Sequence, residues 1–171
     1  MVEVTFAASG DGTQVVIEHS GRERLGDDAA AALAAPIEPE PGEWDVRRVI
    51  AHVAITDLAM LQVCQALVHG NPTRFENAPT QSVEVLDRWV SAADDDVHLL
   101  ERSATASRQL AAALARLPAD QLAHEVERPP VYDDQMMVDE RRSWGQLAIG
   151  IQSEHHRPAH IGQLIDLSSP G

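Results

Sequence analysis

Residues 155–163 read His-His-Arg-Pro-Ala-His-Ile-Gly-Gln, and this stretch near the C-terminus decides how the fold is interpreted. It holds three of the eight histidines of the chain. His156 and His160 stand four residues apart, which on a helix places both imidazoles on one face. One divalent metal ion can take both side chains, but an ion held by protein usually has at least one further ligand.

The best candidate for a third ligand is His52, in a helical segment far away in the sequence. Residues 44–53 read Trp-Asp-Val-Arg-Arg-Val-Ile-Ala-His-Val, and their valines and isoleucine share one apolar face. His52 lies about 60° from the edge of that face, by the angular step of an α-helix. Three neutral imidazoles suit zinc or nickel, and three protein ligands leave a coordination position open, as in catalytic sites.

The two segments together resemble the DinB-like four-helix bundles, whose relatives include thiol-dependent transferases and mycothiol-dependent isomerases. The shared motifs are Trp-x-Val-x-x-Val-x-x-His at residues 44–52 and His-x-x-x-His-x-Gly-Gln at residues 156–163. The resemblance covers residues 38–168. It implies one divalent metal ion bound by His52, His156 and His160, and a low-molecular-weight thiol as co-substrate.

Composition narrows the classes of partner. The 171 residues carry a net charge of −14, which disfavours binding to DNA or RNA. All 13 basic residues are arginines, so a lysine Schiff base is excluded. Cys64 is the single cysteine, and its place on an apolar helix face favours burial over catalysis. We find neither an apolar run long enough to cross a membrane nor a signal peptide, so we expect a soluble, cytoplasmic protein with a small-molecule substrate.

The N-terminal stretch has a different pattern. Apolar and polar residues alternate in residues 2–6 and 13–19 on either side of Ser-Gly-Asp-Gly, which predicts a β-hairpin. Residues 2–33 also resemble the last hairpin and final helix of the START-like domains of heat-shock-protein ATPase activators. We therefore divide the chain into residues 1–35, a START-like tail with a short helix from residue 27, and residues 36–171, the bundle.

The bundle itself is predicted as a series of helices, giving a mainly α fold. We expect helices at residues 43–69 and 82–117, the second with a heptad seam, and a last helix from Ser143 to Leu167 that opens with a capping-box pattern. The acidic run at residues 94–96 is expected to be a solvated face. Residues 118–142 are expected to be irregular and to form a lid. Pro158 predicts a kink between the two late histidines.

Asp57 is the remaining candidate in the site. It falls inside the apolar face of the second helix, where a carboxylate is costly unless it is paired or hydrogen-bonded. It is either a catalytic base, an acceptor behind a metal ligand, or the partner of an arginine. Glu154 and Gln163 are candidates for orienting the imidazoles.

Three hypotheses about function follow. The first is a metal-dependent enzyme that transfers a thiol to a small electrophile, or isomerises the electrophile through a thiol adduct. The second is a metal-dependent hydrolase that uses water at the same site. The third is a non-catalytic, dimeric binding module. The unpaired edges of the hairpin and the short first helix predict a homodimer in which residues 1–35 contribute to the interface.

Overall fold

The computed structural model describes residues 2–9, 12–71, 74–128 and 140–168, and the fold is mainly α-helical, as the sequence predicts. The elements in chain order are β1 (Val2–Ser9), β2 (Gly12–His19), α1 (Ser20–Ala34), α2 (Val46–Val68), α3 (Ala78–Gln81), α4 (Val83–Ser91), α5 (Asp96–Leu114), α6 (Ala119–Leu122), β3 (Glu125–Arg128), β4 (Glu140–Ser143), α7 (Trp144–Ile149), the π-helical turn η1 (Gly150–Glu154) and α8 (His156–Asp166).

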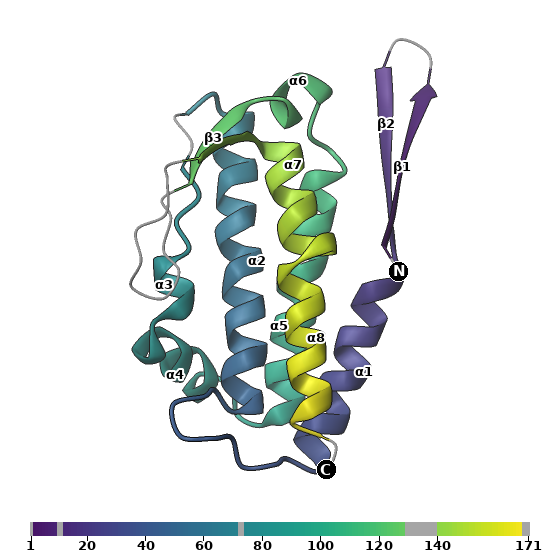
Figure 1. Cartoon of the computed structure of the whole chain (residues 1–171). Coiled ribbons are helices and arrows are strands. Elements are labelled where there is room, and N and C mark those ends of the chain that lie inside the picture. Colours follow the sequence, from purple (N-terminus) through teal and green to yellow (C-terminus); the bar gives the residue numbers. More distant parts are fainter. Residues whose placement is uncertain (1, 10–11, 72–73, 129–139, 169–171) are drawn as a thin grey trace.

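Four long helical segments lie side by side and form the bundle (Figure 1). They are α1, α2, α5 and the rod made by α7, η1 and α8. α2 touches each of the other three, with its most extensive contact on α5. α1 begins at Ser20 and not near residue 27, so the bundle has a first helix of 15 residues. The division of the chain at residue 35 stays a prediction, but α1 packs as a member of the bundle.

α2 is the central helix and the most apolar one. Asp45 caps its N-terminus, where the side chain accepts a hydrogen bond from the Arg48 backbone N–H at 2.8 Å. Its best 18-residue window has a mean hydropathy of 1.5, so by length and composition it passes the test for a membrane span, which we expected no segment to do. However, 61% of that window is buried inside the bundle. A core helix shows this pattern, because its apolar side chains meet other helices.

The helix predicted for residues 82–117 is two helices, and that prediction was wrong. α4 ends at Ser91 and α5 begins at Asp96. Asp95 has an extended backbone and caps α5 by accepting a hydrogen bond from the His98 N–H at 2.8 Å. A short polar side chain competes with the helical backbone in this way, so part of the expected solvated acidic face is a helix start.

The segment after α5 is more ordered than predicted. β3 and β4 form a two-stranded antiparallel sheet, with Glu125 opposite Ser143. The backbone N–H of Phe75 donates to the Glu127 carbonyl at 2.8 Å, which attaches the segment before α3 to this sheet. Residues 129–139, where we predicted a lid, lie outside the described residues.

The N-terminal hairpin has the predicted form. β1 and β2 pair antiparallel from Val2 opposite His19 to Ser9 opposite Gly12. β2 runs directly into α1, and Figure 1 shows the strands extending away from α1 beside the bundle. The packing predicted for the apolar side chains of the hairpin lies outside what the structure describes.

The core of the bundle is divided into two apolar clusters. One, around Met60, Leu110 and Trp144, joins α2, α5 and α7; the other, around Val49, Leu99 and Leu164, joins α2, α5 and α8. Between them on α2 stand three buried polar residues, His52, Thr56 and Asp57. Facing them from the other helices are the buried residues Ser103, Ser107 and Arg157. A polar layer at mid-height therefore interrupts the core, and buried polar groups in such a layer need partners.

Candidate metal centre

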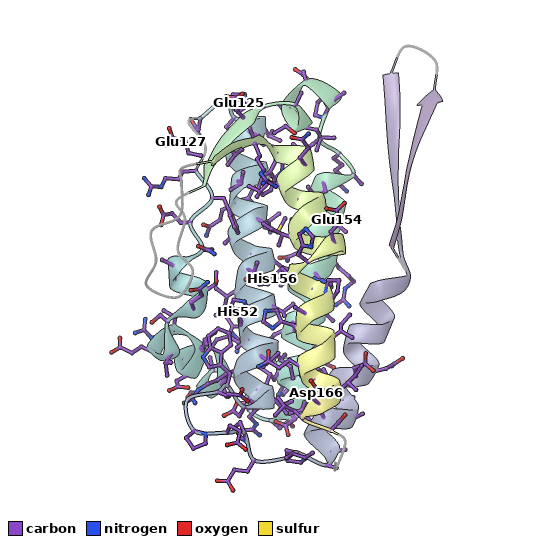
Figure 2. All side chains as sticks on the ribbon, in the orientation of Figure 1. His52, Glu125, Glu127, Glu154, His156 and Asp166 are labelled. Atoms are coloured by element: carbon purple, nitrogen blue, oxygen red, sulfur yellow. The ribbon has the colours of Figure 1, made fainter. Side chains whose placement is uncertain are left out.

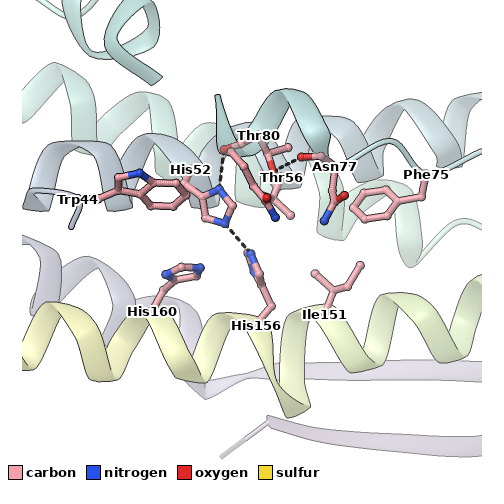
Figure 3. Close-up of a pocket in the computed structure, with 10 residues that line it drawn as sticks. Trp44, His52, Thr56, Phe75, Asn77, Thr80, Ile151, His156 and His160 are labelled. Atoms are coloured by element: carbon pink, nitrogen blue, oxygen red, sulfur yellow. Dashed lines mark hydrogen bonds between the residues drawn. The ribbon is translucent and has the colours of Figure 1, made fainter. Parts of the chain in front are cut away.

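Three histidines from two helices converge at this layer. His52 comes from α2, and His156 and His160 come from successive turns of α8 (Figures 2 and 3). Each offers one ring nitrogen, and these nitrogens all lie within 4.8 Å of one another. The Nε2 atoms of His52 and His156 are 2.8 Å apart. The three residues that the sequence singled out are thus brought together, although 104 residues separate His52 from His156.

Two of the rings are held from behind. Nδ1 of His52 lies 2.6 Å from the backbone carbonyl of Thr80, and Nδ1 of His160 lies 3.0 Å from the side-chain carbonyl of Gln163. Both oxygens only accept hydrogen bonds, so in the neutral rings Nδ1 carries the proton and Nε2 is bare. Metal-binding histidines in proteins are typically oriented by such contacts. The Thr80 carbonyl was not predicted; Gln163 was.

The short contact between His52 and His156 places one proton at the centre. Since Nε2 of His52 is bare, the Nε2–H of His156 is the donor across the 2.8 Å separation. Binding of a cation by all three rings therefore requires the His156 proton to move to Nδ1 or to leave. Proton release on metal binding is a general property of such sites.

Burial keeps these rings neutral. His52 is 4% exposed, and burial, against the opposing effect of the Thr80 carbonyl, lowers its pKa from 6.5 to about 4. Burial also lowers the pKa of His160, while the contact with Gln163 acts in the other direction. Neutral imidazole is the form that binds a metal ion, so at pH 7 both side chains are in the required state.

The start of α8 differs from the kink that Pro158 predicted. α7 ends at Ile149, five residues follow in a π-helical turn, and α8 begins at His156, after His155 with φ −130° and ψ −63°. Pro158 therefore lies in the first turn of α8, where a missing N–H costs nothing. The break precedes both histidines and does not separate them, so their spacing of one helical turn is preserved.

A cavity of about 260 Å³ opens at the three histidines. One wall comes from α2, α3 and the segments before them, and the other from η1 and α8 (Figure 3). Its lining is Trp44, His52, Thr56, Phe75, Asn77, Thr80, Gln81, Ile151, His156 and His160. The Trp44 ring lies 4.9 Å from the His52 ring, between centroids. The site is therefore a pocket with apolar and polar walls and three imidazoles at one place in it.

A family model for the mycothiol maleylpyruvate isomerase N-terminal domain matches residues 17–144, which is most of the 171-residue chain. The chain belongs to that family. This confirms the resemblance to the DinB-like proteins. No curated protein and no solved structure matches the chain.

The family match covers His52 but ends before His156 and His160. The assignment of the two later histidines thus depends on the motif at residues 156–163 and on the geometry of this structure. The match also begins at residue 17, inside β2, so it includes all of α1. It does not address the START-like resemblance of the hairpin, which stays a prediction.

Asp57 is paired. It is fully buried, and its carboxylate accepts hydrogen bonds from Arg157 at 2.7 Å and from the Ser107 hydroxyl. It does not line the cavity. Among the three roles considered for this residue, the geometry favours the arginine partner. Sequence reasoning did not identify Arg157, although a chain without lysine leaves arginine as the obvious buried cation.

Other candidates lie away from the centre. Glu154 and His155 are exposed and 4.0 Å apart, so neither orients a ring of the trio. Cys64 is 1% exposed, and the Trp144 indole N–H donates to its sulfur at 3.3 Å. Burial raises the pKa of the Cys64 thiol to about 11. This cysteine is therefore a core residue, as the sequence predicts.

Proposed function

We propose that this protein is a metal-dependent enzyme that joins a low-molecular-weight thiol to a small electrophile, or isomerises the electrophile through the thiol adduct. The observation that carries the proposal is the convergence of three oriented, neutral imidazoles in a pocket. Membership of a family described by mycothiol and an isomerase supports the thiol as co-substrate.

The residues present fit a divalent ion such as zinc or nickel. Such ions lie about 2.0–2.1 Å from imidazole nitrogens, so two ligands of one ion are at most about 4.2 Å apart. The nitrogens of the trio are within 4.8 Å of one another, so a ring shift below an ångström brings them into range. When bound, the ion lowers the pKa of a thiol that coordinates to it.

The chain supplies the surroundings of the reaction. His52, His156 and His160 hold the ion on one side of the pocket and leave its remaining positions toward the cavity. Trp44, Phe75 and Ile151 give apolar walls, which exclude water around the reacting sulfur. A cavity of about 260 Å³ is slightly smaller than the pockets of drug-sized ligands, so it takes a small electrophile or one end of a larger thiol.

Metal content is the first test. Protein purified after metal-replete expression should contain close to one divalent ion per chain by elemental analysis. His156→Ala and His160→Ala should each abolish the bound metal, because two imidazoles hold such an ion poorly. His124→Ala, which changes an exposed histidine, is the matched control. Wild-type protein without metal would rule the proposal out.

Activity is the second test. The metal-loaded chain is incubated with mycothiol and either maleylpyruvate or monochlorobimane, and products are followed by mass spectrometry. We expect isomerised maleylpyruvate or a bimane thioether, with loss of both in His156→Ala. Turnover of substrate in the absence of any thiol would instead favour the hydrolase. Metal binding without turnover of either substrate would favour the non-catalytic module. The cytoplasm, where thiols are kept reduced, is the compartment that we propose for this chemistry.

A further inference from the structure

Two polar side chains in the cavity wall lack partners. The hydroxyl of Thr56 and the side-chain oxygen of Asn77 are buried, and neither atom has a hydrogen-bond partner among the described residues. Thr56 is 3% exposed and Asn77 is 8% exposed, and both line the same cavity as the three histidines. A buried polar atom without a partner costs about 1–3 kcal/mol. Two such atoms on one wall therefore indicate that a ligand supplies the partners.

The position of Asn77 makes this more specific. It is the N-cap residue of α3, where an asparagine side chain normally accepts a hydrogen bond from the first turn. Here the side chain makes no cap hydrogen bond. Instead, the backbone carbonyl of Asn77 accepts from Thr80, from its N–H at 2.9 Å and from its hydroxyl at 2.7 Å. The Asn77 amide is thus free of the cap, and Figure 3 shows it directed between Phe75 and Thr56 toward the facing helix.

The chemistry of this wall selects a neutral group. The asparagine side chain offers a donor and an acceptor in one plane, so whichever way it is turned it pairs with another amide. The threonine hydroxyl donates or accepts. Among the described residues that line the cavity there is no arginine and no carboxylate. A ligand carboxylate would therefore leave its charge in a buried pocket without a counter-ion, which is costly.

We propose that Thr56 and Asn77 form a subsite for a neutral amide group of the thiol co-substrate, next to the position of its sulfur at the three histidines. The inference rests on the proposed function for the place of the sulfur. It adds the substrate class: an amide of a cysteine-like thiol, with its carboxyl group blocked, and not the free amino acid. Thr80 connects the two places, because its carbonyl orients His52 while its N–H and hydroxyl hold the backbone of Asn77.

Binding of two matched thiols tests the subsite. The probes are N-acetylcysteine N-methylamide, which is neutral, and N-acetylcysteine, which carries a carboxylate, titrated into the metal-loaded full chain by calorimetry. We expect the neutral amide to bind at least tenfold more tightly. Thr56→Val and Asn77→Leu should each weaken the amide about five- to tenfold, the usual value of one hydrogen bond. Neither variant should change the affinity for N-acetylcysteine by a comparable factor.

Controls separate binding from folding. Asn71→Leu and Thr105→Val change exposed residues of the same types and should leave both affinities unchanged. In the ligand-free state Thr56→Val should unfold at the same temperature as wild type or higher, since it removes a buried polar atom without a partner. Equal binding of the two thiols, or unchanged amide binding in both Thr56→Val and Asn77→Leu, would overturn the inference.

The two proposals fail differently. The same titrations on metal-free protein should keep the preference for the amide at lower absolute affinity, because Thr56 and Asn77 contact the ligand and not the ion. An amide preference in a chain that binds no metal would overturn the proposed function alone. Full metal content by elemental analysis without an amide preference would overturn the subsite alone.

Discussion

At the scale of single residues, His52 is the most perturbed group of the site, and this predicts acid sensitivity. Its pKa is about 4 in the folded chain and 6.5 in the unfolded one. Between these values the unfolded chain binds a proton that the folded chain rejects, so the free energy of unfolding falls as the pH drops from 6.5 to 4. The loss is about 3 kcal/mol for metal-free protein.

Denaturant unfolding of metal-free protein at several pH values measures this loss. His52→Gln should show a shallower fall in the free energy of unfolding across the same range, while the exposed His124→Gln should follow wild type. Parallel curves for wild type and His52→Gln would contradict the assignment. The metal affinity should also fall less steeply through pH 6 to 5 than three free histidines would give, since His52 and His160 both have lowered pKa values.

Gln163 gives a second prediction at this scale. Its side-chain carbonyl holds the Nδ1 proton of His160, so Gln163→Leu should leave that ring free to turn and to change tautomer. Loss of such a contact typically lowers metal affinity about 10- to 100-fold. Competition with a chromogenic chelator measures the change. Gln109→Leu, on the exposed side of α5, should bind metal as wild type does.

At the scale of helices, a buried ion pair joins α2 to α8 one turn away from the trio. Asp57 and Arg157 are 1% and 5% exposed, so removing one partner leaves a buried charge uncompensated. We expect Asp57→Ala to lower the free energy of unfolding by about 3–5 kcal/mol. The double variant Asp57→Ala/Arg157→Met should recover part of that loss, because it buries no lone charge.

Metal content separates this structural role from catalysis. If Asp57 acts only through Arg157, the double variant should bind metal and, once folded, retain most of the wild-type turnover. A double variant that is folded and metal-loaded but inactive would instead assign Asp57 to the reaction. Urea unfolding, elemental analysis and the bimane assay on the same preparations decide between these outcomes.

The sequence predicts long amphipathic helices well and their interruptions poorly. The periodicity of α2 and the four-residue spacing of His156 and His160 are local properties, and both are confirmed. The break at Asp95 and the π-helical turn before His156 depend on a few hydrogen bonds that a periodic pattern does not contain. Likewise, the roles of Thr80 and Arg157 follow from contacts between helices about 30 and 100 residues apart, which no local motif shows.

At the scale of the whole molecule, the oligomeric state stays a proposal. The hairpin of β1 and β2 is a two-stranded sheet with an open edge on each side, and such sheets are marginal alone in water. We expect the full chain to be a homodimer in which residues 1–35 contribute to the interface. Light scattering on the full chain and on a chain without residues 2–19, which keeps α1 in the bundle, tests this. A full-length monomer at micromolar concentration, or an equally dimeric shortened chain, would contradict it.

The contact between Trp44 and His52 gives the site an optical reporter. The chain has three tryptophans, and replacing Trp89 and Trp144 by phenylalanine leaves the indole of Trp44 as the single emitter, 4.9 Å from a proposed ligand. An ion with a partly filled d shell, such as nickel, quenches indole emission at this range, whereas zinc has a filled shell and does not. The fluorescence of that one ring, recorded before and after chelation, would therefore indicate which of the two metals the protein carries.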